Sequence, residues 1–256
     1  MIDWTLLATL PPTPERIRRV SLALRSPDPA ERDDHAYAQL CRWVPELDEP
    51  ERRALGDAMA ERFTDPEVQA RTFAPLILTK IVEAGTYDPA WLAAFARWYP
   101  AETDLRGHDA ELGWLHAVAH GADLLGAFGR CPGTDPVALL ELAVARLLAP
   151  TDHVLDAMED DRLGHAIGLA LTRQELTEQG STAWLEPIAA EFRAGRPGPV
   201  PAHASNTIRT LRVVYLLADR GVRPDRRGSA AEPLRHAEAV RSRVAEVLSI
   251  TSPYAG

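Results

Sequence analysis

Four Asp-Pro dipeptides, each followed by apolar residues in helical periodicity, constrain the fold more than any other feature of the sequence. They lie at 28–29, 65–66, 88–89 and 135–136. An Asp side chain accepts hydrogen bonds from the free amides at the start of a helix, and Pro fits the first helical position because its φ is already set. Alternating runs of β-branched or aromatic residues, which strands need, are absent from the sequence. The chain is therefore predicted to be all-α.

The expected helices follow one another closely along the chain. Together with the apolar-periodic segments that lack an Asp-Pro start, the four Asp-Pro segments make about ten or eleven helices in all. Connections of roughly 3–8 residues between them favour antiparallel neighbours. The expected spans are 14–25, 30–44, 48–63, 66–84, 89–99, 107–128, 136–149, 153–178, 181–194, 204–220 and 230–249.

The order of these helices favours a stacked architecture. The segment that begins at Asp65 has the Asp-Pro-x-Val start of HEAT-type helical hairpins, whose period is about 40–47 residues. The Asp-Pro spacings are irregular, so no strict repeat is expected. We therefore predict paired antiparallel helices, in either a HEAT-like irregular α-solenoid or a multi-helix bundle. The whole chain, 1–256, is expected to form a single domain, with a Pro/Gly-rich break at 194–205 before the last helix pair.

Composition and charge exclude several classes of protein. The formal net charge is −9 and the arginines are interspersed with acidic residues, whereas a nucleic-acid-binding surface needs a basic stripe. No apolar run reaches the ~18–20 residues of a membrane span, and no basic segment precedes the first apolar stretch as in a signal peptide. Neither GxxxxGKS/T nor GxGxxG is present, so no nucleotide cofactor is expected. The sequence indicates a cytoplasmic protein with a small-molecule or peptide ligand and no nucleic-acid or membrane partner. Its oligomeric state is left open.

One predicted helix, 107–128, combines an apolar circumference with a line of polar residues. On a helical wheel His116, His120 and Asp123 fall within a fan of roughly 60°, with Asp109 beside them. A helix that is apolar nearly all round is expected to be buried. Burying imidazoles and a carboxylate costs several kcal/mol unless these groups find partners. The polar residues of this helix are therefore the strongest candidates for a functional site.

Three interpretations of this line of residues remain open. His116 and His120 are spaced i, i+4, as in zinc-binding helices, and Asp123 could be a third ligand or a carboxylate that orients a ring. A divalent metal such as zinc, manganese or iron would then be the cofactor. Ala117 occupies the position of the Glu in H-E-x-x-H, which argues against a zinc protease. Without metal, the same groups could act as general acid and base in a pocket. In the third interpretation they are hydrogen-bonded core residues.

Charged residues on either side of this helix could complete the site. Asp104 and Arg106 lie just before its predicted start. Asp104 could cap the helix, or both residues could meet substrate, with Arg106 binding an anion bidentately. Glu159 belongs to an acidic segment, 152–168, that could bring a further carboxylate to the two histidines or could form a solvent-exposed face. Asp104, Arg106 and Glu159 are thus candidate catalytic residues.

Three stretches of the chain resemble a family of uncharacterised bacterial proteins, DUF2785. The stretches are DLRGHDAELGWLHAVAHGADLL, MEDDRLGHAI and NTIRTLRVVYLL. The family pairs an acidic-Arg-Gly element with a Gly-Trp-x-His-x-x-x-His-x-x-Asp helix and a downstream Glu-Asp-x-Arg-Leu. The matching positions are Asp104, Arg106, Gly107, Gly113, Trp114, His116, His120, Asp123, Glu159, Asp160, Arg162 and Leu163. The resemblance covers about residues 30 to 220 and implies an all-helical fold, with no activity to carry over.

Two hypotheses from different classes follow from the sequence. In the first, the chain is a small-molecule enzyme with a metal-assisted, hydrolytic or lyase-type reaction at a His/Asp site on helix 107–128. In the second, it is a non-catalytic helical-repeat module that binds its partner on a concave face, and the His/Asp line is structural. The enzyme hypothesis predicts a cavity lined by these groups, whereas the binding module predicts that they are buried and satisfy one another.

Overall fold

A computed structural model describes residues 2–196, 198–225 and 228–252, and there the protein is an all-α multi-helix fold. Its α-helices are α1 (Trp4–Leu7), α2 (Pro14–Ala23), α3 (Ala38–Trp43), α4 (Glu49–Glu61), α5 (Val68–Glu83), α6 (Pro89–Trp98), α7 (Ala117–Arg130), α8 (Pro136–Leu147), α9 (Glu159–Ala170), α10 (Glu178–Thr182), α11 (Leu185–Ala194), α12 (Ala202–Arg220) and α13 (Ala237–Thr251). A π-helical segment (Ala30–Tyr37) leads into α3, and 3₁₀ turns (Val44–Glu46, Arg62–Thr64) follow α3 and α4. Two short antiparallel strands, β1 (His108–Asp109) and β2 (Gly113–Trp114), form a hairpin between α6 and α7.

Each of the four Asp-Pro dipeptides lies at or just before the start of a helical segment. In each, the Asp carboxylate accepts a hydrogen bond of 2.8–3.0 Å from the amide two residues further on. This bond satisfies one of the amides that have no partner inside the helix. Asp88 and Asp135 are the N-caps of α6 and α8, with Pro at the first helical position as predicted. Asp28 and Asp65 lie one and two residues before the N-caps of the π-helical segment and of α5.

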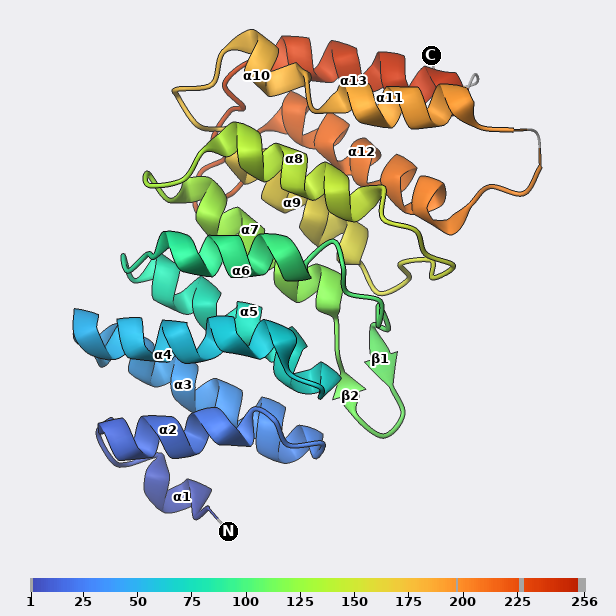
Figure 1. Cartoon of the computed structure of the whole chain (residues 1–256). Helices are drawn as coiled ribbons and strands as arrows, with labels where there is room; N and C mark the ends of the chain where they lie inside the picture. Colours follow the sequence, from blue (N-terminus) through green and yellow to red (C-terminus); the bar gives the residue numbers. More distant parts are fainter. Residues whose placement is uncertain (1, 197, 226–227, 253–256) are drawn as a thin grey trace.

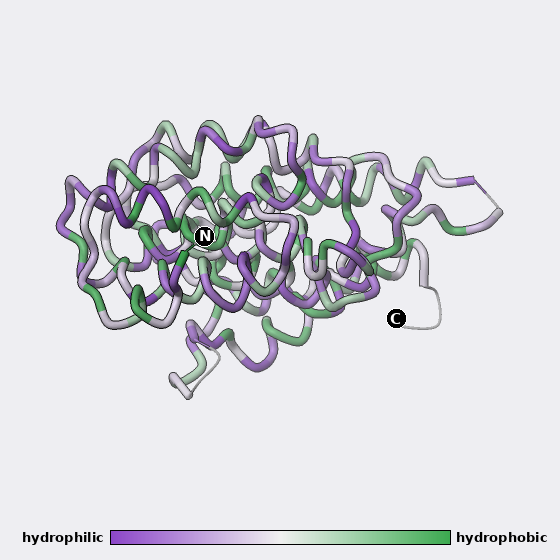
Figure 2. Tube along the Cα trace, turned by 90° about the horizontal axis from the view of Figure 1, so that it is seen from below, coloured by the Kyte–Doolittle hydropathy of each residue, from purple (hydrophilic) through white to green (hydrophobic). Residues whose placement is uncertain are grey.

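The helices stack in two layers (Figure 1). Helices α2, α4, α6, α8 and α11 follow one another in the front layer, and α3, α5, α7, α9 and α12 follow one another behind it. Helix α13 packs on α11 and α12 at the C-terminal end of the stack. Along the helical turns in Figure 2, hydrophobic and hydrophilic residues alternate, so most helices have one apolar side. Nearly all buried hydrophobic residues of the described chain form one cluster that extends from Leu7 to Leu248.

Helix α7 lies at the centre of the rear layer, between α5 and α9. Its residues are mostly buried, as the apolar sequence predicts. A glycine allows close approach to the preceding helix: a Cβ at Gly121 would lie 2.1 Å from a ring carbon of Tyr99. The Tyr99 hydroxyl donates to the Val118 carbonyl at 2.8 Å. These contacts fix the first turns of α7 relative to the end of α6.

The predicted helix 107–128 is wrong at its N-terminal end, because α7 begins only at Ala117. Residues 107–116 form the hairpin and the approach to the helix instead. The Asp109 carboxylate accepts from the amides of Glu111 and Leu112, both at 2.9 Å, and this turn replaces helical hydrogen bonds. Gly113 has a φ of 71°, which glycine adopts without strain. The helical wheel that placed Asp109 on one face with the histidines was therefore also wrong.

Most other differences also lie at helix ends, apart from the short helix α1, which was not predicted, and the π-helical start of the predicted helix 30–44. Helix α9, Glu159–Ala170, is shorter at both ends than the predicted helix 153–178. It begins at Glu159 because Met158, just before it, has a φ of 64°. The last predicted helix, 230–249, begins only at Ala237. Residue 197 of the predicted break at 194–205 lies outside the described residues. No helix in the described part of the chain is long and apolar enough to cross a membrane.

Candidate functional site

The hairpin that leads to α7 is held in place by a buried arginine from the start of the chain. Arg32 is completely buried, and its Nη2 donates to the carbonyls of Leu112 at 2.6 Å and Trp114 at 3.4 Å. Its Nε donates to the Asp33 carboxylate at 2.6 Å, and its guanidinium lies 4.6 Å from the centre of the Phe73 ring. Arg32 therefore fixes the backbone just before His116.

His116 lies at the N-terminus of α7 in a left-handed backbone conformation, with φ 48° and ψ 41°. Its amide lies within hydrogen-bonding range of the carbonyls of Arg106 and Gly107. Its ring stacks on the indole of Trp114, with centroids 4.4 Å apart and planes 4° apart. Its Nδ1 lies 3.1 Å from Glu159 Oε1, and 12% of the side chain is exposed. The ring is thus held on two sides but is not closed off from solvent.

The carboxylate that contacts His116 comes from the first residue of α9 and is completely buried. Glu159 Oε2 accepts from the Ala157 amide at 2.9 Å. Burial raises the pKa of Glu159, but the hydrogen bonds from His116 and from backbone amides outweigh it, and the net pKa lies below its usual range. The carboxylate is therefore ionised at neutral pH and only accepts, so His116 Nδ1 is the donor.

A glycine just before the hairpin leaves room for the contact between His116 and Glu159. A Cβ at Gly107 would lie 2.8 Å from Glu159 Oε1 and 3.7 Å from His116 Cε1. Any larger residue at this position would displace the carboxylate or its neighbour Ala157. The acidic-Arg-Gly element that precedes the hairpin therefore shapes the site through its glycine.

His120 lies one turn into α7 and is buried, with 6% exposed. Its Nδ1 lies 2.9 Å from the Thr72 carbonyl of α5, and because a carbonyl only accepts, Nδ1 carries the proton. Burial, followed by the positive charges of Arg162 and other neighbours, holds the pKa of His120 well below its usual value. His120 is therefore neutral, with the lone pair on Nε2. Its ring centroid lies 5.6 Å from that of His116.

Asp123 does not join the two histidines. It forms an ion pair with Arg162 of α9, in which Arg162 Nε donates to Oδ1 at 3.1 Å and Nη2 donates to Oδ2. Among the residues that the structure describes, no group of three or more His, Cys, Asp or Glu side chains is arranged to hold a metal ion. Of the three residues predicted as metal ligands, the structure therefore brings only His116 and His120 together.

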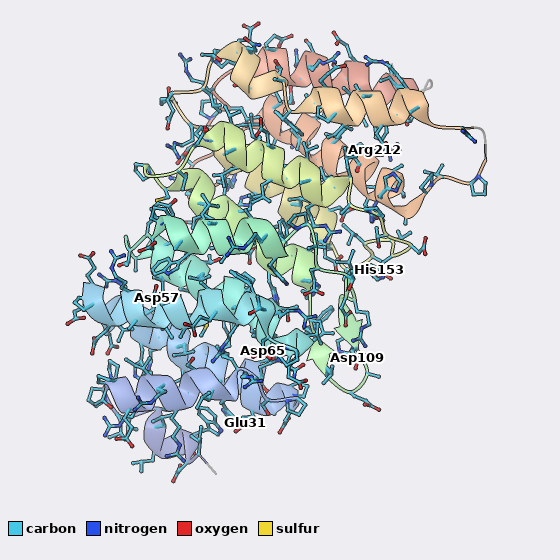
Figure 3. The ribbon with its side chains drawn as sticks, viewed as in Figure 1. Glu31, Asp57, Asp65, Asp109, His153 and Arg212 are labelled. Atoms are coloured by element: carbon cyan, nitrogen blue, oxygen red, sulfur yellow. The ribbon has the colours of Figure 1, made fainter. Side chains whose placement is uncertain are left out.

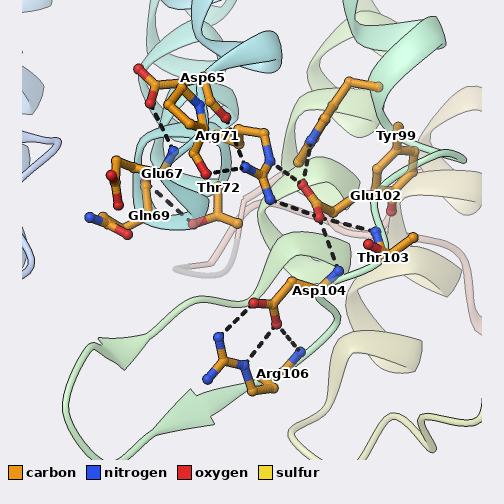
Figure 4. A network of polar contacts seen from close by, with 12 residues as sticks. Asp65, Glu67, Gln69, Arg71, Thr72, Tyr99, Glu102, Thr103, Asp104 and Arg106 are labelled. Atoms are coloured by element: carbon orange, nitrogen blue, oxygen red, sulfur yellow. Dashed lines mark hydrogen bonds and ion pairs between the residues drawn. The ribbon is translucent and has the colours of Figure 1, made fainter.

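Asp104 and Arg106 pair with each other on the hairpin side of the site (Figure 4). Arg106 Nε donates to Asp104 Oδ1 at 2.8 Å, Nη2 donates to Oδ2 at 2.6 Å, and Nη1 donates to Asp109. The guanidinium of Arg106 lowers the pKa of Asp104. Asp104 does not cap a helix, because no helix begins at 107. Arg106 is already neutralised by two carboxylates, which leaves it little capacity to bind an anion.

A second buried carboxylate, Glu102, lies next to this pair (Figure 4). It accepts from Arg71 Nε at 2.6 Å and Nη2 at 3.1 Å, and from Trp98 Nε1 at 2.8 Å. The amides of Thr103 and Asp104 donate to it as well, both at 3.0 Å. Burial raises the pKa of Glu102, but these donors and the charge of Arg71 leave the net pKa below its usual range.

Three further residues of the site were not selected from the sequence. Trp114 and Arg162 stand inside the stretches that resemble the family, which is the signal that could have identified them. Arg32 gave no such signal, because it lies 80 residues from Leu112 along the chain. A groove of about 950 Å³ on the front layer, between α4 and α6, includes none of the predicted site residues in its lining.

Comparison with known proteins places the chain in a family. A family model described as "Protein of unknown function (DUF2785)" matches residues 59–216, more than half of the chain and the whole of the His116 site apart from Arg32 and Asp33. The chain belongs to the DUF2785 family. No curated protein and no solved structure matches it.

Proposed function

We propose that this protein is a cytoplasmic small-molecule enzyme in which His116 transfers a proton in a hydrolytic or lyase-type reaction. One observation carries the proposal: the partly exposed imidazole of His116 is hydrogen-bonded through Nδ1 to the completely buried, ionised carboxylate of Glu159. With its proton held on Nδ1, the neutral ring has its lone pair on Nε2, the atom that accepts a proton from water or substrate. Glu159 orients the ring and stabilises the imidazolium that forms, and it remains ionised throughout.

The surroundings of His116 support a functional role. His116 and Met158 are the only non-glycine residues with positive φ in the described part of the chain, and each directly precedes a helix that contributes to the site. Such backbone strain persists where the surrounding structure enforces it, often at active sites. Two large apolar side chains next to these residues are exposed: Trp114, which stacks on His116, at 47%, and Met158, which precedes Glu159, at 66%. In our proposal they contact the apolar part of the substrate.

The test compares the wild type with His116→Asn in a screen of small esters, amides and lyase substrates. Asn is tolerated in the left-handed conformation, so this variant keeps the backbone of the site. The matched control is His203→Gln, because His203 also pairs with a glutamate, Glu191, but on the surface. We expect turnover in the wild type and in the control and loss of turnover in His116→Asn. Turnover that survives in His116→Asn would contradict the proposal.

A metal-assisted reaction is the second candidate, and the orientation of both histidines favours it. His116 and His120 each have Nδ1 held by an acceptor, which is the arrangement of metal-ligating histidines whose other nitrogen binds the ion. Their ring centroids, 5.6 Å apart, are close to the separation of about 5 Å that follows from two Nε2 atoms bound to one tetrahedral zinc. A zinc, manganese or iron ion would act there as a Lewis acid.

Metal content distinguishes these two candidates. The protein is purified without an affinity tag or chelator and measured by plasma mass spectrometry beside His120→Gln, which keeps a donor toward Thr72. Near-stoichiometric metal that is lost in His120→Gln would support the metal-assisted reaction. Metal-free protein that still turns over substrate would support His116 acting with Glu159 alone. Protein without metal and without turnover would favour the rival function, a helical-repeat binding module.

A further inference from the structure

A groove of about 410 Å³ lies on the front layer between α2 and α4, away from His116. Its lining contains three arginines and two carboxylates: Arg18, Arg25, Arg62, Glu61 and Asp65. Its volume is in the range of small-molecule sites. Asp65, labelled in Figure 3, belongs to this lining and lies where the turn after α4 leads into α5.

Arg62 is the unusual member of this lining, because it is buried at 8% exposure without an ion-pair partner of its own in the described residues. Its Nη2 donates to the Ser21 carbonyl at 2.6 Å and to the Ser21 hydroxyl at 2.8 Å. Its Nη1 is closed off from solvent and has no hydrogen-bond partner among the described residues. A buried cation without compensation is costly, since desolvation is not offset by attraction to an opposite charge.

The neighbouring carboxylates do not supply that compensation. Asp65 is already paired with Arg25, at 3.0 Å between Asp65 Oδ2 and Arg25 Nε. Glu61 is exposed and forms no ion pair in the part of the chain that the structure describes. Burial lowers the pKa of Arg62 to about 10, so the guanidinium keeps its charge at neutral pH. The lining therefore has one more positive than negative side chain, and the excess charge is at the buried end.

We propose that this groove binds an oxyanion group of a small molecule, a carboxylate or a phosphate, with Arg62 as its principal ligand. The free Nη1 hydrogens of Arg62 would donate to the oxyanion and supply the missing partner. Arg18 would add charge from the rim, where Arg18 and Leu22 are exposed and can move aside to admit the ligand. This site is independent of the reaction at His116.

The test measures Tm as inorganic phosphate or acetate is added at constant ionic strength. Compact anions such as phosphate also stabilise proteins by exclusion from the surface, and that effect does not saturate at low concentration. We therefore expect a saturating rise of about 3 °C or more with at least one of the two anions in the wild type. Arg62→Met should abolish the saturating rise. Arg53→Met, which changes an arginine of α4 outside the lining of this groove, should retain it.

Two further results make the test decisive. Arg18→Gln changes an exposed residue and should keep the fold, and we expect it to weaken the apparent affinity at least threefold. This variant tests the proposal if Arg62→Met does not fold. The anion that gives the saturating response identifies the group as phosphate or carboxylate. Absence of a saturating rise with both anions, or an equal rise in Arg62→Met, would overturn the proposal.

Discussion

Two buried glutamates of this protein, Glu102 and Glu159, look alike in the sequence but have different partners. Glu102 accepts from a bidentate arginine, an indole and two amides, so its charge is balanced by a group that never loses its proton. Glu159 accepts from backbone amides, among them that of Ala157, and from a histidine. Histidine gains and loses a proton near neutral pH. The Glu102 network therefore stabilises the fold, whereas the Glu159 contact can take part in proton transfer.

The largest expected effect is on turnover, and it distinguishes the two glutamates directly. Glu159→Gln should lower kcat/KM by about 10²–10⁴, because the amide no longer holds His116 in the required tautomer or stabilises its imidazolium. The same change at the exposed partner of His203, Glu191→Gln, should leave kcat/KM unchanged. Steady-state kinetics on the substrate found in the screen provides the measurement. If Glu159→Gln were as active as the wild type, Glu159 would have no role in proton transfer and would not differ from Glu102 in this respect.

The second effect is on stability and belongs to the other glutamate. Glu102→Gln should lower the free energy of unfolding by about 3 kcal/mol, because Arg71 then loses the charge of its partner in a largely buried pair. The control, Glu83→Gln, removes the exposed partner of Lys80 and should change the free energy of unfolding by less than about 0.5 kcal/mol. Urea unfolding measures both. If Glu102→Gln lowered the free energy of unfolding as little as the control does, the Glu102 network would not be what stabilises this part of the fold.

The third effect is a pH dependence that arises at His120. Its pKa in the folded protein lies well below that in the unfolded chain, so below about pH 6.5 the unfolded state binds a proton that the folded state does not. The free energy of unfolding should therefore fall as the pH falls, by up to about 1.4 kcal/mol per pH unit.

The matched variant for this effect is His120→Gln. It keeps a donor toward Thr72 but does not titrate, so its stability should fall less steeply between pH 7 and pH 5. Urea unfolding at several pH values in this range gives both slopes. Parallel slopes in the two proteins would show that His120 is not held neutral by its surroundings.

The smallest effect concerns the backbone strain next to Glu159. Met158 has positive φ and a mostly exposed side chain, so Met158→Gly should relieve strain at little loss of contact. Because glycine also costs entropy on folding, the net gain should be about 0.5 kcal/mol. Thermal unfolding measures the gain. A loss of stability would mean that the Met158 side chain itself holds the start of α9 in place.

The helices could be predicted from the sequence because their starts depend on local chemistry. An Asp carboxylate that caps an amide two residues on needs no distant partner, and the Asp-Pro starts of α6 and α8 were confirmed as predicted. At Asp28 and Asp65 the same bond forms, but the helical segment begins one and two residues later than the Asp-Pro pattern indicates. The start of α7 could not be predicted in the same way. Besides the local turn at Asp109, Arg32, far away in the sequence, donates to the Leu112 and Trp114 carbonyls of the hairpin. The local pattern of apolar residues contains no trace of that contact.

The residues of the site could be predicted only in part, for the same reason. The spacing of His116 and His120 indicated that both rings would be close, and they are. The spacing also suggested Asp123 as their companion, but Arg162 of α9 engages it. The carboxylate that reaches His116 is Glu159, which was only one member of an acidic segment. Which of several acids meets a histidine depends on how two helices pack, and a single sequence does not encode that in any short pattern.

The most direct test of the account is the protonation of the His116 ring, which nitrogen-15 NMR of the imidazole side chains reports. We predict that neutral His116 carries its proton on Nδ1, and that Glu159→Gln shifts the ring toward a mixture of both tautomers. His203→Gln, which removes one surface histidine, assists the assignment and should leave His116 unchanged. A neutral His116 with its proton on Nε2 in the wild type would contradict the account, because Glu159 could not then be the group that prepares this ring for proton transfer.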